Sequence, residues 1–573
     1  MEKTVILQLK NITKKFGSKV IANNNVSLDV YKGEILSILG ENGCGKTTLM
    51  NMVAGIYYPD SGKILINGEE VVIRSPRDAF DHKIGMIHQH FKLIDIFSAA
   101  QNVALGVEGE KFNLKEVNNR IKEMANKYGF HINLDKKIYE MSVSEKQTVE
   151  ILKVLYRGAD ILILDEPTAV LTPQEIRSLF KVLKAMRDDG KSIIIITHKL
   201  NEVMEISDRV AVLRKGDHVA TVNTSETSEK ELTEMMVGEK IDLNINRTDP
   251  VDSKLRLSVS NLTVKSPDGY TVVDNVSFDS FGGEILGIAG IAGSGQKELL
   301  EAIAGLNKYE SGTLIYYHPK KDKPVSFFHK TYKRVMELAN ENAFMDENGN
   351  DIDFTKLSKK EIKELVSSEK IIFKEDEVIN LKDKSPREIR ELGIRLSFVP
   401  EDRLGMGLVG NMDIVDNMML RSYRKGKSMF LDRKRPQDLA NKIINDLKVN
   451  TPDSHTAVRK LSGGNVQKVL VGREIAAAPA ILMTAYPVRG LDINSSYTIY
   501  NLLNEQKQKG VSVIFVGEDL DVLMALSDRI LVLSGGKVSG IVDARTTTKD
   551  EIGLMMVQSK GNEVTEWKRI KAA

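Results

Sequence analysis

The chain contains very little cysteine and almost no net charge. Among its 573 residues the only cysteine is Cys44, so no internal disulfide and no cysteine-based zinc site can form, which fits a reducing cytosol. A formal net charge of +2 gives no strong attraction for nucleic acid, and we expect no nucleic-acid partner. The chain is long enough for two or more domains, and its 42% hydrophobic and 28% charged residues are typical of globular proteins.

Long apolar runs are also missing. No stretch of about 18 apolar residues is present, so we expect no segment to span a bilayer. The N-terminal sequence MEKTVILQLKNITKKFG lacks the apolar core and the cleavage site of a secretory signal. Any membrane contact is therefore expected to be made through another chain.

The sequence does contain an internal duplication. Three triplets recur in the same order: SPR at 75–77 and 385–387, SDR at 207–209 and 527–529, and MMV at 235–237 and 555–557. Each half opens with short alternating strands and continues into an apolar strand, a glycine-rich loop and a helix. Later apolar runs alternate with helical patterns, which indicates parallel strands with crossover helices. We therefore predict two α/β domains of one fold.

The duplication also predicts the domain boundaries. We place the first domain at 1–241, a polar linker at 242–253, the second domain at 254–562 and a basic tail at 563–573. The second half carries an insertion at about 316–375 that the first half lacks. We expect this lysine-rich insertion to be helical near 332–340 and 358–367.

A phosphate-binding loop is predicted in the first half. The pattern Gly40-x-x-x-x-Gly45-Lys46-Thr47 lies between an apolar strand and a helix, where backbone N–H groups and the helix N-terminus attract phosphate. We expect Lys46 to reach the β- and γ-phosphates of ATP and the Thr47 hydroxyl to ligate Mg²⁺. The residues expected to contact the nucleotide here are Gly40, Asn42, Gly43, Cys44, Gly45, Lys46, Thr47 and Thr48.

Two carboxylates follow the buried strand predicted at 161–164. Asp165 is expected to support Mg²⁺, and Glu166 to orient or deprotonate the attacking water, a role that contributes about 10²–10⁴-fold to a rate. His198 ends another apolar strand, at 193–197, and can contact the γ-phosphate. Gln89 can bridge the nucleotide with its metal and a partner protein, and Phe16 can stack on adenine.

A second anion-binding helix start is predicted in the second half. Ser462, Gly463 and Gly464 precede a helix expected to begin near Val466, and their amides can bind phosphate. In the first half Val143 and Ser144 replace the two glycines, and Glu145 puts negative charge where phosphate would approach.

With these motifs assembled, the chain resembles the ATP-binding cassette ATPases over nearly all of its length except the insertion and the tail. The stretches VEILKVLYRGADILILDEPTAVLTPQE at 149–175 and LSGGNVQKVLVGREI at 461–475 are similar to the fused double-cassette subunit of bacterial sugar and nucleoside importers, most of all to the nucleoside branch. The resemblance implies two P-loop cassettes in tandem, each with a RecA-like core, an antiparallel β subdomain and a helical subdomain. It also implies a peripheral ATPase at the cytoplasmic face of the cell membrane, with two permease subunits as partners and an extracellular substrate-binding protein acting indirectly.

The resemblance further implies a head-to-tail pair, in which the phosphate loop of each cassette faces the LSGGQ-type signature of the other. The first composite site then contains Lys46, Thr47, Gln89, Asp165, Glu166, His198, Ser462, Gly463, Gly464 and Asp492. The second has Gln296, Lys297, Glu401, Ala485, Tyr486 and Glu518 at the equivalent positions and faces residues 141–145. A lost charge-assisted phosphate contact costs about 1.5–3 kcal/mol. Because every defect falls on one site, we predict that only the first hydrolyses ATP.

Other functions remain as alternatives. A soluble tandem-cassette translation factor also lacks membrane spans, but such factors usually keep two working sites and a long charged linker. A DNA-repair cassette protein usually carries zinc-binding cysteines, which are absent here. The transported solute, the role of the insertion, nucleotide binding at the second site and the partner stoichiometry stay open.

The last prediction concerns the reactivity of the Cys44 thiol. Its place at a helix N-terminus is expected to lower its thiol pKa and make it reactive, with ATP protecting it. A filler role is the alternative.

Overall fold

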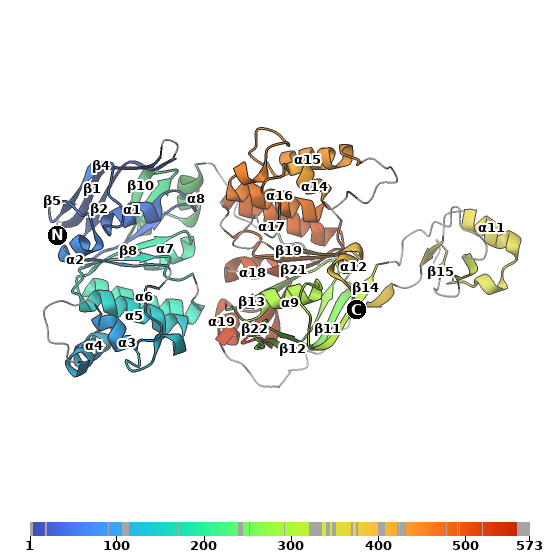
Figure 1. The fold of residues 1–573 in the computed structure, drawn as a ribbon, viewed down its shortest axis with the longest axis horizontal. Coiled ribbons are helices and arrows are strands. Elements are labelled where there is room, and N and C mark those ends of the chain that lie inside the picture. Colours follow the sequence, from blue (N-terminus) through green and yellow to red (C-terminus); the bar gives the residue numbers. More distant parts are fainter. Residues whose placement is uncertain are drawn as a thin grey trace. The chain divides into compact units, whose positions relative to one another are not determined.

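The computed structural model of the chain divides into two compact units, residues 1–244 with 490–494 and residues 245–489 with 495–573, and each is described by itself. Figure 1 shows the ribbon and labels the elements. The structure describes residues 4–17, 20–89, 91–105, 114–169, 171–238, 245–250, 253–291, 293–319, 335–337, 339, 344–346, 351–367, 371–373, 376–398, 407–420, 423, 431–476, 478–489, 491, 493–517 and 519–557. The predicted tail at 563–573 lies outside these residues.

The first unit contains a four-stranded antiparallel sheet, β2-β1-β4-β5, and a six-stranded sheet, β10-β9-β3-β8-β7-β6. The strands of the first sheet are β1 (Val5–Phe16), β2 (Val20–Tyr31), β4 (Ser61–Ile66) and β5 (Glu69–Val71). Those of the second are β3 (Ile35–Leu39), β6 (Ile84–Ile87), β7 (Ile161–Asp165), β8 (Ser192–Thr197), β9 (Arg209–Arg214) and β10 (Asp217–Asn223). All neighbours in the second sheet are parallel except β9 and β10.

The helices of the first unit follow these strands in sequence. They are α1 (Lys46–Val53), α2 (Pro76–Asp81), α3 (Ala99–Ala104), α4 (Leu114–Tyr128), α5 (Val143–Tyr156), α6 (Pro173–Asp188), α7 (Leu200–Ile206) and α8 (Glu229–Val237), with 3₁₀ turns η1 (Ile138–Glu140) and η2 (Thr224–Glu226). Every residue of β3, β7 and β8 is buried, because a parallel sheet is covered on both faces. This burial explains why these strands read as continuous apolar runs.

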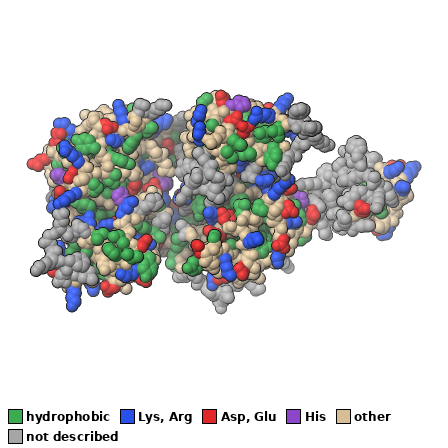
Figure 2. Space-filling view, in the orientation of Figure 1, with side chains coloured by type: hydrophobic (Ala, Val, Ile, Leu, Met, Phe, Trp, Pro, Cys, Tyr) green, Lys and Arg blue, Asp and Glu red, His purple; other side chains and the backbone are tan. Residues whose placement is uncertain are grey.

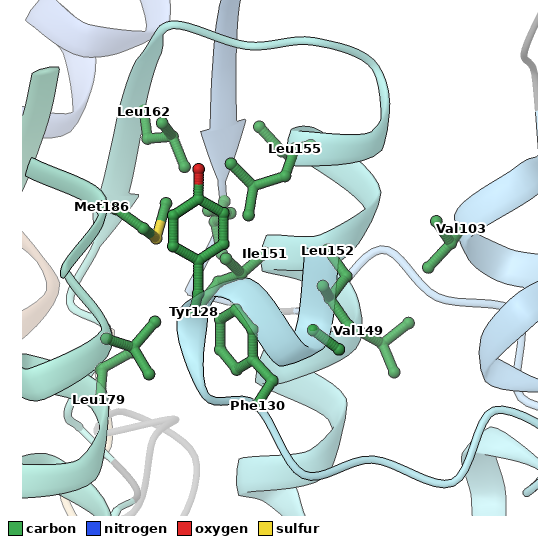
Figure 3. Close-up of a cluster of buried hydrophobic side chains, with 14 of the residues drawn as sticks. Val103, Tyr128, Phe130, Val149, Ile151, Leu152, Leu155, Leu162, Leu179 and Met186 are labelled. Atoms are coloured by element: carbon green, nitrogen blue, oxygen red, sulfur yellow. The ribbon is translucent and has the colours of Figure 1, made fainter. Parts of the chain in front are cut away.

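A helical region packs beside this sheet around Tyr128, the last residue of α4. Figure 3 shows side chains from α5, α6 and β7 gathered near the Tyr128 ring, including Leu155, Leu162 and Met186. The Tyr128 hydroxyl leaves this apolar cluster to donate a hydrogen bond to Asp189 Oδ2 at 2.7 Å. The contact ties the end of α4 to the end of α6.

The second unit repeats the arrangement with sheets β12-β11-β14-β18 and β19-β20-β21-β13-β22-β23. The strands of the first are β11 (Leu255–Lys265), β12 (Thr271–Phe281), β14 (Ser311–His318) and β18 (Glu377–Asn380). Those of the second are β13 (Ile285–Gly290), β19 (Ile394–Phe398), β20 (Ile481–Ala485), β21 (Ser512–Val516), β22 (Arg529–Ser534) and β23 (Lys537–Asp543). Its helices are α9 (Gln296–Ile303), α12 (Pro386–Glu391), α14 (Ile414–Met419), α15 (Lys434–Asp446), α16 (Gly463–Ile475), α17 (Ile493–Gln508), α18 (Leu520–Leu526) and α19 (Lys549–Val557), with the 3₁₀ turn η4 (Val458–Lys460). The prediction of two α/β domains of one fold is confirmed.

The predicted start of α16 near Val466 is wrong by three residues, because the helix begins at Gly463. Ser462 has extended backbone angles and is the N-cap, so the two glycines form the first turn. Glycine weakens a helix interior, which is why the sequence favoured a later start.

The insertion has a core of its own. It forms the small sheet β16-β15-β17, from β15 (Phe344–Met345), β16 (Asp351–Ile352) and β17 (Ile372–Phe373), together with η3 (Phe354–Lys356) and α11 (Lys359–Ser367). Among its described residues, one cluster of buried side chains contains Val335, Phe344, Phe354, Ile362 and Ile371. The helix predicted at 358–367 is confirmed as α11.

The surface carries charge of both signs. Figure 2 shows Lys and Arg interspersed with Asp and Glu on the visible face of each unit. Within the described ranges, none of the helices combines the length and the apolar character that a bilayer crossing requires.

Candidate functional site

The loop between β3 and α1 has the backbone geometry of a phosphate cradle. Gly43 and Gly45 have positive φ angles of 81° and 99°. A Cβ atom at Gly45 would lie 2.1 Å from Ala22 O, so only glycine fits there. The buried Asn23 side chain donates to Gly45 O at 3.2 Å and supports the loop from β2.

The predicted phosphate ligands lie on this loop and on the first turn of α1. Lys46 is buried, and its Nζ donates to Gly40 O at 2.7 Å and to Glu41 O at 3.0 Å, so the amine lies inside the loop. Thr47 is exposed, and its hydroxyl donates to Asp165 Oδ1 at 3.3 Å. The other predicted loop residues differ in exposure: Asn42 and Gly43 are exposed, and Thr48 is half-buried.

Glu166 follows β7 and connects two other predicted residues. Its Oε1 lies 2.9 Å from His198 Nδ1, and its Oε2 accepts a hydrogen bond from Gln89 Nε2 at 3.0 Å. The backbone at Glu166 has φ 46°, a conformation rare for a non-glycine residue and common at functional sites. The Glu166 N–H donates to Ile196 O at 2.9 Å, which fixes this turn against β8.

The two carboxylates have opposite pKa shifts. Burial, and then the charge of Glu166, raise the pKa of Asp165 to about 6. Burial alone would raise the pKa of Glu166, but the hydrogen bond and the charge of His198, with the charges of Lys46 and Lys199, lower it. Glu166 is therefore ionised at neutral pH and can accept a proton, as a general base must.

Sequence reasoning missed residues that support the acidic turn. Lys199 Nζ pairs with Glu202 Oε1 at 3.0 Å, and Glu202 Oε2 accepts from the Thr168 hydroxyl at 2.6 Å. From α5, Gln147 Nε2 donates to Pro167 O at 2.7 Å. In the sequence, Lys199 and Glu202 stand out only because they are near His198, and Gln147 only because it is near residues 141–145. Neither position predicts these contacts.

Phe16 lies at the end of β1 with 41% of its surface exposed. Its ring meets Tyr57 edge to face, with centroids 5.4 Å apart. An exposed aromatic ring can stack on a base, and the stacking of adenine on Phe16 stays a prediction.

The prediction of a lowered thiol pKa at Cys44 is wrong. The side chain points inward to the apolar core, with 5% of its surface exposed. Burial raises the pKa of the Cys44 thiol, outweighing Lys46 and the backbone amides. The filler role fits this environment better.

The second unit keeps the frame of the site and changes its side chains. Gln296 takes the place of Lys46, is buried, and donates to Ile291 O at 3.1 Å. Ala485 ends β20, and Tyr486 has φ 52° and donates its N–H to Val516 O, as Glu166 does to Ile196 O. Lys297, the counterpart of Thr47, is exposed on α9. Three further residues predicted for the two sites, Glu401, Asp492 and Glu518, lie outside the described residues.

Ser462, Gly463 and Gly464 start α16 in the second unit. Ser462 accepts no capping hydrogen bond from the backbone of the first turn. The pairing of these residues with the loop at Gly40–Thr48 stays a prediction.

Comparison with known proteins gives a family for both units. The model of the family described as ABC transporter matches residues 23–169 and 273–485. The nucleoside import ATP-binding protein NupA of Lactococcus lactis is 36% identical over 98% of this chain and 100% of its own length, and the guanosine import ATP-binding protein NupO of Bacillus subtilis is 38% identical over 97% and 98%. The ribose import ATP-binding protein RbsA of Caldanaerobacter subterraneus is 33% identical over 96% and 99%.

Proposed function

The chain belongs to the ABC transporter family as a tandem-cassette ATPase, and from this premise we propose that it energises the import of a nucleoside or a simple sugar. A nucleoside is favoured, because the two relatives named for nucleoside or guanosine import are 36% and 38% identical and the ribose relative is 33% identical. The partners are two permease subunits at the cytoplasmic face of the membrane, with an extracellular substrate-binding protein acting through them.

ATP binds first to the loop of the first cassette. Phe16 stacks on adenine, the loop amides from Gly40 to Thr48 surround the phosphates, and Lys46 neutralises the β- and γ-phosphates. Ser462, Gly463 and Gly464 of the second cassette complete the site from the other side.

Mg²⁺ fits the oxygen donors beside this loop. The Thr47 hydroxyl and the Asp165 carboxylate are 3.3 Å apart, and hydroxyl and carboxylate oxygens are the ligands that Mg²⁺ prefers. Gln89 would add an amide oxygen to these donors, because it is the amide nitrogen of the same side chain that donates to Glu166. Thr47 and Asp165 would hold the ion, which when bound would offset the negative charge that develops on the phosphates.

Glu166 accepts a proton from the attacking water, and His198 holds the Glu166 carboxylate and contacts the γ-phosphate. The observation that supports this assignment is the pair of hydrogen bonds from Gln89 and His198 to an ionised, half-buried Glu166. Tyr486 and Ala485 offer no carboxylate in the second cassette, so hydrolysis occurs in the first site alone.

ATP draws the cassettes together, and hydrolysis lets them separate. This motion moves permease helices docked near Gln89 and its counterpart Glu401.

The test replaces the two equivalent residues separately. Glu166→Gln is expected to reduce ATP turnover by about 10²–10⁴-fold, because the general base is lost. Tyr486→Phe keeps the ring and is expected to leave turnover unchanged. Equal losses in the two variants, measured by phosphate release with the permeases present, would contradict a single hydrolytic site.

A further inference from the structure

The exposed ring of Phe16 is contacted by a second exposed ring. Phe16 is the last residue of β1, and Tyr57 lies four residues after the end of α1. The two rings meet edge to face, with centroids 5.4 Å apart and planes at 76°. Since 41% of Phe16 and 38% of Tyr57 are exposed, the pair lies at the surface and leaves area on the Phe16 ring open to a further aromatic group.

The backbone of Tyr57 is fixed to α1. The N–H groups of Ile56 and Tyr57 both donate to Asn51 O, at 2.8 Å and 3.2 Å. The chain turns away from the helix at Gly55, which has φ 73°. Because α1 begins at Lys46 on the phosphate loop, one helix carries that loop at its start and the Tyr57 ring just after its end.

A lysine connects the Phe16 ring to the segment that follows Tyr57. Lys14 Nζ lies 5.8 Å from the centroid of the Phe16 ring, within the range of a cation–π contact. The same ammonium donates to Tyr58 O at 2.7 Å and to Asp60 Oδ1 at 3.1 Å. The end of β1 and the segment after α1 are therefore joined by an ion pair, a hydrogen bond to the backbone and the contact between two rings.

The second cassette has the same backbone contact between these two segments. Asp60 donates its N–H to Thr13 O at 2.9 Å, and Glu310 donates its N–H to Thr263 O at 2.8 Å. The residues at the end of β1 therefore align with those at the end of β11, and the residues after α1 align with those after α9.

The side chains at the aligned positions differ. Ser266 takes the place of Phe16, and Asn307 takes the place of Tyr57. The Asn307 amide donates to Glu301 Oε2 at 2.7 Å, so this side chain turns back to α9. At these two positions the facing rings are present in the first cassette, which also has the lysine of the phosphate loop, and are replaced in the second.

We propose that Tyr57 is a positioning residue for the adenine base of ATP, because it holds the Phe16 ring in the orientation in which that ring stacks on the base. This role rests on the proposed function, which places adenine on Phe16. An exposed aromatic side chain loses rotational freedom when a base stacks on it, and this loss reduces the affinity. With Tyr57 and Lys14 already in contact with the ring, less freedom is left to lose when ATP binds.

A purely structural role for Tyr57 would be to join β1 to α1. Loss of such a role would disturb the phosphate loop as much as the base, and would weaken the binding of any phosphate chain. Inorganic tripolyphosphate separates the two roles, because it offers phosphates to the loop and no base to Phe16. The ratio of the affinities for ATP and tripolyphosphate therefore isolates the contribution of the base.

Titration calorimetry with Mg²⁺ measures both affinities at the stronger site of the full chain, with Glu166→Gln in every variant to prevent hydrolysis. Phe16→Ala is expected to weaken ATP binding by about tenfold or more, because the stack is lost. Tyr57→Ala is expected to weaken ATP binding by about three- to tenfold and to leave tripolyphosphate binding unchanged. Tyr57→Phe keeps the ring and is expected to restore ATP binding. Tyr58→Ala is the matched control with no expected change, because it keeps the carbonyl that accepts from Lys14.

A double-mutant cycle tests whether Tyr57 acts through Phe16. In a Phe16→Ala chain, the added Tyr57→Ala change is expected to have no further effect on ATP binding. An equal loss with and without the Phe16 ring would overturn the inference, since Tyr57 would then not act through that ring. Unchanged ATP binding in Tyr57→Ala, an equal loss of ATP and tripolyphosphate binding in that variant, or an equal loss of ATP binding in Tyr58→Ala would also overturn it.

The same variants separate the role of Tyr57 from the proposed function. If Phe16→Ala leaves the ratio of the two affinities unchanged, adenine does not stack on Phe16, and that part of the proposed function fails. If Phe16→Ala lowers the ratio and Tyr57→Ala does not, the stack stands and the role of Tyr57 alone is overturned.

Discussion

Equivalent backbone positions in the two cassettes carry side chains with different chemical properties. Glu166 and Tyr486 share a positive φ and the same hydrogen bond to the neighbouring strand, yet one is an ionised acid and the other a phenol. Lys46 and Gln296 both turn back to carbonyl groups of their own loop. The buried strands and the glycine turns therefore keep the frame of a site after its reactive side chains have gone.

The same comparison extends to an ion pair at the start of the strands β3 and β13. Asp208 and Asp528 each accept from the first N–H of the central strand, at Ile35 and Ile285. The partner of Asp208 is the partly exposed Arg187, whereas Lys507 beside Asp528 is fully buried. In the second unit Lys507 also donates to Thr248 O, in the segment predicted as the linker, so this segment contacts the pair.

Lys507→Met should give the largest effect. It leaves the carboxylate of Asp528 buried with a weaker partner, Arg545 at 4.0 Å, and is expected to cost about 3 kcal/mol in the second unit. Arg187→Met in the first unit is expected to cost no more than about 1 kcal/mol, because that pair is partly solvated. Denaturant unfolding of the two variants checks the difference, and equal losses would mean that the linker does not change the pair.

Asp165→Asn tests the acidic turn through pH. Because the pKa of about 6 in the folded chain lies above the ordinary 3.8, the folded state binds this proton more tightly than the unfolded state does. The ionised carboxylate therefore destabilises the nucleotide-free first unit above pH 6, and the penalty disappears as the pH falls toward 4. Asp165→Asn is expected to stabilise the unit at pH 8 by up to about 3 kcal/mol, from about two pH units at about 1.4 kcal/mol each.

Differential scanning calorimetry at pH 8 and pH 4, without nucleotide, measures this change. The reverse substitution in the second unit, Ala485→Asp, is the control and is expected to lower the transition temperature of that unit at pH 8. Stabilisation by Asp165→Asn that is as large at pH 4 as at pH 8 would rule out the titration of Asp165 as its cause.

Lys46→Ala and Gln296→Ala compare the two phosphate loops. Loss of the Lys46 amine is expected to weaken ATP binding by about 1.5–3 kcal/mol, or about 10–100-fold, because a charge-assisted contact is removed. Gln296→Ala removes only a neutral contact within the loop and is expected to change ATP binding by less than about threefold. Titration calorimetry on each chain distinguishes the two results, and a larger loss with Gln296→Ala would reverse the assignment of the stronger site.

Labelling of Cys44 gives the smallest effect. Because the thiol is buried and its pKa is raised, a maleimide is expected to react with it at least about tenfold more slowly than with an exposed thiol at neutral pH. Tyr139→Cys, at a position with 62% of its surface exposed, supplies that reference in a Cys44→Ala chain. Comparable rates at the two positions would restore the earlier expectation of a reactive Cys44.

Local sequence patterns predicted much of the difference between the two cassettes. The run Gly40 to Thr48 and the acids after β7 are contiguous, so their spacing predicted both the turn and its chemistry. The contacts of Glu145 with Lys136 could not be predicted, because a lysine nine positions before Glu145 faces this carboxylate only after the intervening turn η1 has formed. The lowered thiol pKa of Cys44 was wrong for a related reason. The position of Cys44 near a helix start can be read from the sequence, but its burial depends on the apolar core around it.

The sequence by itself determined the duplication, the two parallel-sheet domains, and which copy retains a lysine, a hydroxyl and two acids for phosphate chemistry. Those properties depend on residue type and spacing within short segments. Only the tertiary structure decided that Thr47 meets Asp165 and that Glu166 is held between Gln89 and His198. The reason is the strand order: β3 and β7 both lie beside β8, so residues far apart in the chain meet at one edge of the sheet.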